Sequence, residues 1–152
     1  MTLGLTSVTS LTDVSAAQWN ALCPANNPFI RYDFLHGLEQ SCCVGSTKSG
    51  WVPRHLLIHD QEILVAALPL YEKYDSYGEF IFDWSWSRAA HMNGIAYYPK
   101  LVSAIPFTPA TGPRFLTHPD YPRDELIGLL TAGLAEVAKQ LDASSIHILF
   151  ET

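Results

Sequence analysis

The fold is decided by residues 97–150, which read YYPKLVSAIPFTPATGPRFLTHPDYPRDELIGLLTAGLAEVAKQLDASSIHILF. Residues 98–107 are apolar and bounded by prolines, which predicts a strand, and the Ala-Thr-Gly-Pro run at 110–113 predicts a turn. A helix over 123–142 and a second strand over 145–150 complete the stretch. Because a helical crossover of this length joins parallel neighbours, the stretch predicts a parallel strand pair linked by a helix.

The helix over 123–142 is the most regularly patterned element of the chain. Its apolar residues recur every three or four positions, as one face of an amphipathic helix requires. Pro122 suits the first turn. Asp124 and Glu125 favour the positive end of the helix dipole, and Lys139 lies near the negative end. The apolar stripe comprises Leu126, Ile127, Leu130, Leu134, Val137, Ala138 and Leu141.

The last strand carries apolar residues on both of its faces. Ile146, Ile148 and Phe150 fall on one face, and Leu149 falls on the other. Two apolar faces predict a buried central strand. The sequence stops soon afterwards, which would leave the far edge with unpaired backbone groups. We therefore expect this to be the N-terminal portion of a longer protein, or another chain to cover that edge by self-association.

The first hundred residues predict elements that cover or extend the parallel pair. Ser15 is predicted to cap the first helix. Together the elements predict one α/β domain over residues 1–152, with a mixed central sheet of about six strands flanked by helices. We expect strands at 4–11 and 77–82, a hairpin of 51–60 and 62–73, and helices at 16–22, 31–41 and 83–94.

Composition excludes several classes of protein. The 152 residues are 48% hydrophobic and 16% charged, so the chain can bury a core. Nine Lys and Arg residues stand against fifteen Asp and Glu, which gives a net charge of −6. The basic residues are scattered along the chain and form no stripe, so a broad surface for DNA or RNA is not expected.

The cysteines and the N-terminus favour a cytoplasmic protein. Cys23, Cys42 and Cys43 are odd in number and form no C-x-x-C motif, so we expect reduced thiols. No basic residue precedes Arg31, whereas a secretory signal begins with a positive region. No apolar run approaches the roughly 18 residues that a membrane span needs.

Metal and nucleophile motifs are not recognised in the sequence. His55 and His59 are four positions apart, but in a strand this spacing covers about 13 Å, too far for one ion. We expect both rings to face the surface and no metal to bind. The chain contains no G-x-S-x-G, P-loop, G-x-G-x-x-G or H-E-x-x-H motif, and nothing nearby activates a cysteine.

Aromatic and charged residues gather in three neighbouring stretches. These are residues 71–79, residues 83–86 and residues 97–100. The rings either line a substrate groove or complete the core, and the sequence leaves both interpretations open. Lys100 and Asp83 stand among apolar residues, where a charge requires a partner or a ligand.

Four runs taken together resemble a known family. They are NPFIRYDFLHGLE from residue 27, SYGEFIFDWSW from 76, YYPKLVSAIPFTPATGPRFL from 97 and SSIHILF from 144. In this order they resemble the FemAB-like predicted N-acyltransferases of the GNAT superfamily, which are related to peptidoglycan biosynthesis. Family proteins are usually longer and have a second related half, which agrees with the expectation of an N-terminal portion lacking its C-terminal strands.

The resemblance implies transfer of an acyl or aminoacyl group to an amine acceptor, such as a small molecule or a peptide. In such folds two parallel strands splay apart, the donor lies between them, and a backbone N–H holds its carbonyl oxygen. The loop over residues 106–114 is the position implied for the donor. The residues assigned to it are Thr108, Thr111, Gly112 and Arg114.

A carboxylate or a tyrosine would take the proton from the attacking amine. Asp83, Glu79 and Tyr98 are the candidates for this role. The residues assigned to the acceptor are Tyr77, Trp86, Tyr97 and Lys100.

One departure from the superfamily concerns the donor. Coenzyme A enzymes place a Q/R-x-x-G-x-G/A loop before a helix, and TPATGPR lacks that pattern. Asp120, Asp124 and Glu125 at the helix start would repel a pyrophosphate. Acyl-coenzyme A and aminoacyl-tRNA both remain open as donors. The alternative function is a non-catalytic module that binds a peptide or a cell-wall precursor, or an inactive fragment.

Overall fold

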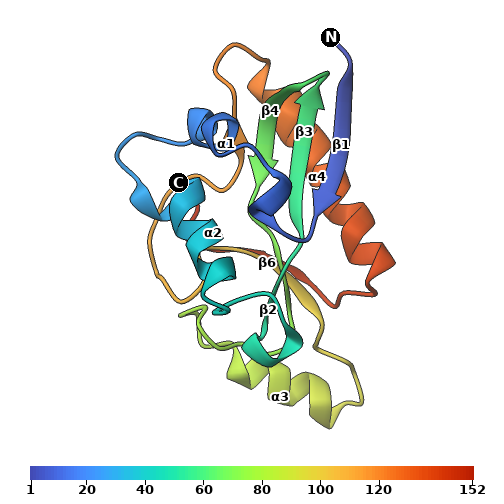
Figure 1. Cartoon of the computed structure of the whole chain (residues 1–152). Helices are drawn as coiled ribbons and strands as arrows, with labels where there is room; N and C mark the ends of the chain where they lie inside the picture. The colour runs from blue at the N-terminus through green and yellow to red at the C-terminus, as the bar shows by residue number, and fades with distance from the viewer.

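One long, bent hairpin ties together the two sheets of the protein, whose computed structural model describes residues 1–152 (Figure 1). Its first arm contains β2 (Trp51–Pro53) and β3 (His55–Asp60), and its second arm contains β4 (Ile63–Leu68) and β5 (Tyr71–Lys73). β3 pairs with β4 in one sheet, and β2 pairs with β5 in the other. The predicted hairpin is confirmed, but it serves two sheets.

The first sheet has the order β1 (Leu3–Val8), β3, β4, β7 (Leu116–Thr117), and all its pairs are antiparallel. On one face lies α4 (Arg123–Gln140), and on the other lies α1 (Ala16–Leu22) (Figure 1). Alternating residues of β3 point to the two covers. Leu57 joins the core beside α1, whereas Leu56 and Ile58 join the core beneath α4. β3 is therefore covered on both of its faces.

The second sheet has the order β2, β5, β6 (Lys100–Ser103), β8 (Ile146–Ile148). β6 and β8 are parallel, and Leu101 is paired with Ile146. The chain between them contains α4, so the predicted strand–helix–strand unit is confirmed. The helix nevertheless packs on the first sheet rather than on the pair that it links.

Two helices complete the architecture. α2 (Tyr32–Gln40) packs beside α1, and α3 (Trp84–Met92) lies below the second sheet with no buried residue (Figure 1). Ser15 caps α1 as predicted, because its side chain accepts a hydrogen bond from the N–H of Gln18. The three cysteines are free thiols, also as predicted. No helix is both long enough and apolar enough to cross a membrane.

Three expectations about strands are wrong. The structure has two four-stranded sheets in place of one mixed sheet. β8 is an edge strand, and Ile146 and Ile148 are 40% and 36% exposed, so the strand is not a buried central one. The pattern of apolar residues along a strand indicates whether its two faces are covered. It does not indicate whether another strand pairs with each of its edges. Residues 77–82 form a loop rather than a strand, because Phe80 and Phe82 have the positive φ angles of the left-handed region, 62° and 53°.

The prediction that the His55 ring faces the surface is also wrong. It lies in β3 as expected, but its side chain is fully buried rather than surface-facing. Its Nδ1 accepts a hydrogen bond from the N–H of Leu70, at 3.1 Å. Its ring packs edge-on to the rings of Trp19 and Tyr71. The reason is that β3 is covered on both faces, so no position in its first half reaches solvent.

Candidate functional site

The residues predicted for the site fall into two groups at opposite ends of the parallel pair β6 and β8. The acceptor group surrounds the N-terminal ends, where Lys100 begins β6. The loop over residues 106–114 follows the carboxyl end of β6. One pocket lies at each end, and the two pockets share no lining residue.

Lys100 is a buried anchor for carboxylates. Its side chain is fully buried, and its Nζ donates to Oδ2 of Asp83 at 2.6 Å and to Oε1 of Glu79 at 2.8 Å. A third hydrogen bond runs to Oγ of Ser76, at 3.0 Å. All three ammonium donors are therefore used inside the protein. Lys100 thus has the charged partners that its apolar neighbours in the sequence indicated. It has no free hydrogen-bond donor left for direct contact with a substrate.

A second buried lysine extends the same cluster. Lys73 Nζ lies 3.3 Å from Oδ1 of Asp75, 3.9 Å from Oε2 of Glu79 and 3.9 Å from the centre of the Trp51 ring. Burial lowers the pKa of Lys73 to about 8, although the neighbouring carboxylates oppose the shift. Burial also raises the pKa of Glu79. With all groups ionised, two lysines face three carboxylates, so one negative charge is unmatched.

Asp83 is the member of the cluster that reaches a pocket. Its burial favours a raised pKa, but the hydrogen bonds from Lys100 and Tyr97 and the charge of Lys100 prevail and lower the pKa to about 2. The Tyr97 hydroxyl donates to Oδ2 at 2.5 Å. The other oxygen, Oδ1, is buried and has no hydrogen-bond partner. Asp83 is therefore an anion at neutral pH, a weak proton acceptor and a strong attractor of cations.

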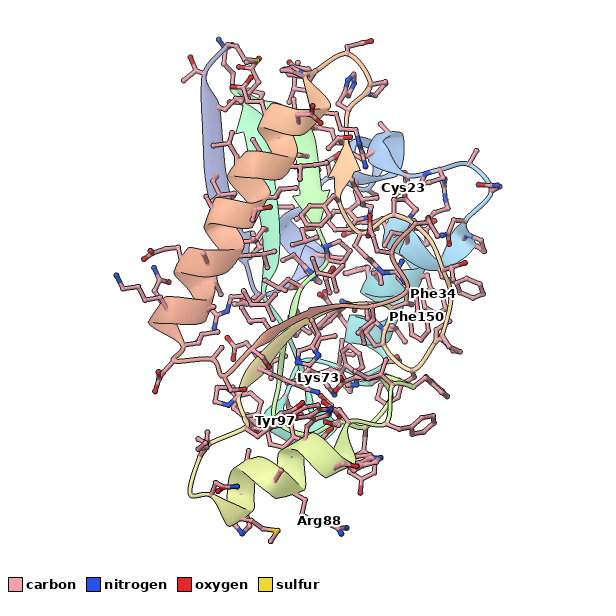
Figure 2. All side chains as sticks on the ribbon, turned by 180° about the vertical axis from the view of Figure 1, so that it is seen from behind. Cys23, Phe34, Lys73, Arg88, Tyr97 and Phe150 are labelled. Carbon is pink, nitrogen blue, oxygen red and sulfur yellow. The ribbon has the colours of Figure 1, made fainter.

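The pocket beside Asp83 has a volume of about 430 Å³. Two of its aromatic walls, Phe82 and Trp86, are each 73% exposed, so Trp86 belongs to a groove rather than to the core. Figure 2 shows Tyr97 above α3, with Lys73 further inside the protein and Arg88 on the far side of the helix. We call this the Asp83 pocket; it is lined by Ile81, Phe82, Asp83, Trp86, Tyr97, Ser145 and His147.

His147 is a pocket residue that the sequence did not single out. One of its ring nitrogens, Nε2, lies 2.8 Å from Oγ of Ser145. Burial and the charge of Lys100 lower the pKa of His147, which keeps the ring neutral at pH 7. The available signal was its position in β8, where it alternates with Ile146 and Ile148 and so faces the other side of the sheet.

Three other predicted residues lie beside the Asp83 pocket without lining it. Glu79 is buried and bonded to Lys100. Tyr98 places its hydroxyl 2.6 Å from Oγ of Ser76, so it belongs to the same polar network. Tyr77 is exposed and packs its ring edge-on against Trp84, with 5.1 Å between the ring centres.

The second pocket, of about 630 Å³, lies at the carboxyl ends of the two strands. Thr111 and Gly112 line it, whereas Thr108 and Arg114 do not. None of the side chains that line it is charged, so it offers no cation to a phosphate. We call it the loop pocket; it is lined by Pro24, Asn26, Asn27, Pro28, Phe29, Pro109, Ala110, Thr111, Gly112, Pro113 and Thr152.

Arg114 holds the loop together from inside. Its guanidinium is fully buried and donates to the carbonyls of Leu149 at 3.0 Å, Gly112 at 3.3 Å and Ala110 at 2.5 Å. Burial lowers the pKa of Arg114, and Glu151 opposes the shift. Because its donors are directed at main-chain carbonyls, Arg114 shapes the loop pocket and does not face a ligand.

The ladder between β6 and β8 stops where this loop begins. The N–H of Leu149 still donates to the carbonyl of Ser103, at 3.0 Å. The next parallel hydrogen bond would join the N–H of Ile105 to the carbonyl of Leu149, but Arg114 occupies that carbonyl. The N–H of Ile105 has no acceptor, and neither have those of Ala110 and Thr111 in the wall of the loop pocket.

A carboxylate that the sequence interpretation missed stands at the same end. Glu151 pairs with Gly112 in an isolated parallel bridge, and its Oε2 accepts from the N–H of Arg114 at 2.5 Å. Burial raises the pKa of Glu151, although Arg114 opposes the shift. Nothing in the local sequence marks this residue, because its position depends on the loop returning to β8. No group of three or more His, Cys, Asp or Glu side chains is placed to hold a metal ion.

Comparison with known proteins identifies one family. A family model described as FemAB-like, peptidoglycan biosynthesis/recognition, matches residues 10–152. No curated protein and no solved structure matches the chain.

Proposed function

The chain belongs to the FemAB-like family of peptidoglycan biosynthesis/recognition, and from this premise we propose that it transfers an acyl or aminoacyl group to an amine acceptor of peptidoglycan metabolism. The proposal includes a fold of the GNAT type, in which two splayed parallel strands receive the donor. The description of the family supports the peptidoglycan context. The residues at the carboxyl ends of β6 and β8 support the chemistry.

The interrupted ladder is the observation that carries the proposal. Acyl transfer to an amine builds negative charge on the carbonyl oxygen, and preorganised N–H groups stabilise that charge. Ala110 and Thr111 provide two consecutive N–H groups without acceptors in the wall of the loop pocket. Because Arg114 binds the carbonyl of Ala110, the N–H of Thr111 in the same peptide group is held in place before a donor arrives.

The donor enters the loop pocket with its acyl end. The pocket walls carry no charged side chain, and Asp124 and Glu125 occupy the first turn of α4. Phosphates of coenzyme A or of a tRNA therefore find no cationic site in these walls and stay outside them. The reactive carbonyl is the part of the donor that this loop recognises.

Glu151 is the proton acceptor in this scheme. The attacking amine forms a bond to the carbonyl carbon, the donor's leaving group departs with its electron pair, and the surplus ammonium proton passes to a base. A carboxylate whose pKa is raised by burial accepts a proton more readily than one at pKa 2. Asp83, Glu79 and Tyr98 lie at the other end of β6, so in this scheme they serve acceptor recognition.

The test is a transfer assay with two variants at one position. Purified protein is mixed with an acyl-coenzyme A or an aminoacyl-tRNA and with a peptidoglycan peptide that bears a free amine, and the peptide's mass is followed. Thr111→Pro removes one N–H, and loss of a single oxyanion donor typically costs about 100-fold to 1,000-fold in rate. Thr111→Ala keeps the N–H and should stay within a few-fold of wild type.

Both variants are first compared by urea unfolding, so that a folding defect is recognised. Equal rates for Thr111→Pro and Thr111→Ala would reject the role of the loop. Absence of transfer from every acyl and aminoacyl donor would reject the enzymatic function altogether and would favour a binding module.

A further inference from the structure

We propose that the Asp83 pocket binds a primary ammonium group carried on an apolar stem, at a recognition site separate from the transfer loop. The proposal stands without the transfer chemistry. Under the proposed function, this ammonium group belongs to the acceptor molecule but is not the amine that reacts, because the pocket lies at the opposite end of β6.

The first argument is a carboxylate oxygen without a hydrogen-bond partner. Asp83 is only 7% exposed, and Lys100 and Tyr97 both bind its Oδ2, so Oδ1 is left without a partner. Buried polar atoms in folded proteins are almost always hydrogen-bonded. A cation with N–H donors would give this oxygen its missing partner.

The second argument is the chemistry of the walls. Phe82, Trp86 and Tyr97 line the pocket with aromatic rings, a type of side chain that attracts cations and also covers an apolar stem. Ser145 and His147 add two polar groups that carry no positive charge at neutral pH. An anionic ligand would be repelled by Asp83. A metal ion would find a single carboxylate among the lining residues, which is too few ligands.

The third argument concerns the form of the cation. Oδ1 is one acceptor in a closed position, and only a group with an N–H or an O–H can donate to it. A quaternary ammonium has no such donor, so the pocket should reject it. Oδ1 is closed to solvent in this structure. Entry therefore requires the rim to move, and Phe82 and Trp86 are exposed enough to do so.

The experiment is a titration of the purified protein with three probes of equal stem length, followed by amide chemical shifts. n-Pentylamine should shift the amides of residues 81–86 and 145–147 and should saturate. n-Pentanol and pentyltrimethylammonium should bind at least tenfold more weakly. Equal binding of the three probes, or no saturable shift in these residues, would overturn the proposal.

Two carboxylate variants locate the charge that matters. Asp83→Asn should weaken n-pentylamine binding at least tenfold. Asp75→Asn removes one negative charge from the same cluster but lies outside the pocket, so it should bind within threefold of wild type. Unchanged binding by Asp83→Asn would contradict the proposal. If Asp83→Asn does not fold, Trp86→Ala gives a second test at an exposed position, and it should bind at least threefold more weakly.

The same titration separates this proposal from the proposed function. Thr111→Pro alters the loop pocket at the other end of β6, so it should bind n-pentylamine as wild type does. A protein that binds n-pentylamine through Asp83 and transfers nothing would support the recognition site and reject the enzyme. A protein that transfers acyl groups but binds the three probes equally would reject the recognition site alone.

Discussion

At the scale of single residues, Asp83 makes folding sensitive to acid. Its pKa is about 2 in the folded protein, against an ordinary value of 3.8, so the unfolded chain takes up the proton first as the pH falls. The stability that Asp83 contributes is complete above about pH 4 and is lost as the pH falls towards 2. This carboxylate thus links the Lys100 cluster to the acid limit of the fold.

The corresponding prediction concerns Asp83→Asn. The variant should be less stable than wild type at pH 6, because Lys100 loses one of its two carboxylates. Its urea midpoint should fall less between pH 5 and pH 3 than that of wild type. Parallel pH profiles for the two proteins would contradict the assignment of a low pKa to Asp83.

Arg114 is the residue on which the loop pocket depends. Its planar guanidinium donates hydrogen bonds to three carbonyls. The compact ammonium group of a lysine cannot reach all three in the same geometry. Arg114→Lys should lower the free energy of unfolding by about 2 kcal/mol, the scale for hydrogen bonds from a charged group. It should also speed amide exchange at Thr108 and Gly112, whose N–H groups donate to the carbonyls of Ile105 and Phe150.

Arg123→Lys is the matched control. Arg123 is exposed and donates one side-chain hydrogen bond, to Oγ1 of Thr117 at 3.1 Å. A surface change of this kind should alter stability by less than about 0.5 kcal/mol. If urea unfolding gives the same result for Arg114→Lys and Arg123→Lys, the clamp is not important for the loop.

At the scale of elements, α4 contains two glycines with opposite roles. A Cβ on Gly128 would meet no atom within 4 Å, whereas a Cβ on Gly133 would lie 2.6 Å from Cδ2 of Leu5. Gly133 thus lets α4 approach β1 closely. Gly128→Ala should stabilise the protein by about 0.5–1 kcal/mol through helix propensity.

A branched residue at the second glycine should do the reverse. Gly133→Val must displace Leu5 and Leu56, so it should lower the free energy of unfolding by about 1–3 kcal/mol. Thermal unfolding of the two variants beside wild type provides the measurement. Stabilisation by Gly133→Val would show that α4 does not pack as closely as described.

β8 presents an open sheet edge with two exposed isoleucines. Such an edge pairs readily with another strand, and a lysine on it discourages pairing. We predict that the chain self-associates through β8 at high concentration and that Ile146→Lys reduces the effect. Native mass spectrometry over a concentration series measures both. A protein that stays monomeric in wild type and variant alike would contradict the prediction.

Local patterns explain which elements the sequence could predict. Three features depend only on residues that are close together in the sequence, so they can be recognised without knowing the fold. They are the apolar spacing of α4, the Ser15 cap and the residues of the hairpin. The division of the hairpin between two sheets depends on where distant strands pair. The edge position of β8 depends on the same information, which explains why the alternation of apolar residues was misleading.

The candidate site divides in the same way. The need of Lys100 and Asp83 for partners follows from their apolar neighbours, and the structure pairs them with each other. His147 and Glu151 reach the two ends of the candidate site only because β8 and the residues after it lie beside β6 and the following loop. Sequence reasoning assigned the loop to the donor and the other residues to the acceptor, but it could not show that the two groups lie at opposite ends of β6.

At the scale of the whole molecule, the two proposals together assign a separate task to each end of the parallel pair. One end offers unpaired N–H groups in an uncharged pocket, and the other offers a buried carboxylate among aromatic rings. An acceptor long enough to span β6 would place a cationic group in one pocket and its reacting amine in the other. Under the two proposals, we expect extended acceptors such as peptides to be better substrates than small amines.

The most direct measurement is the mass of an amine-bearing peptidoglycan peptide after incubation with the purified protein and a panel of acyl-coenzyme A and aminoacyl-tRNA donors. The account predicts that the peptide gains the mass of one acyl or aminoacyl group with at least one donor. It also predicts that Thr111→Pro slows the gain about 100-fold to 1,000-fold, whereas Thr111→Ala stays within a few-fold of wild type. A peptide whose mass stays unchanged with every donor would contradict the claim that this protein is a transferase.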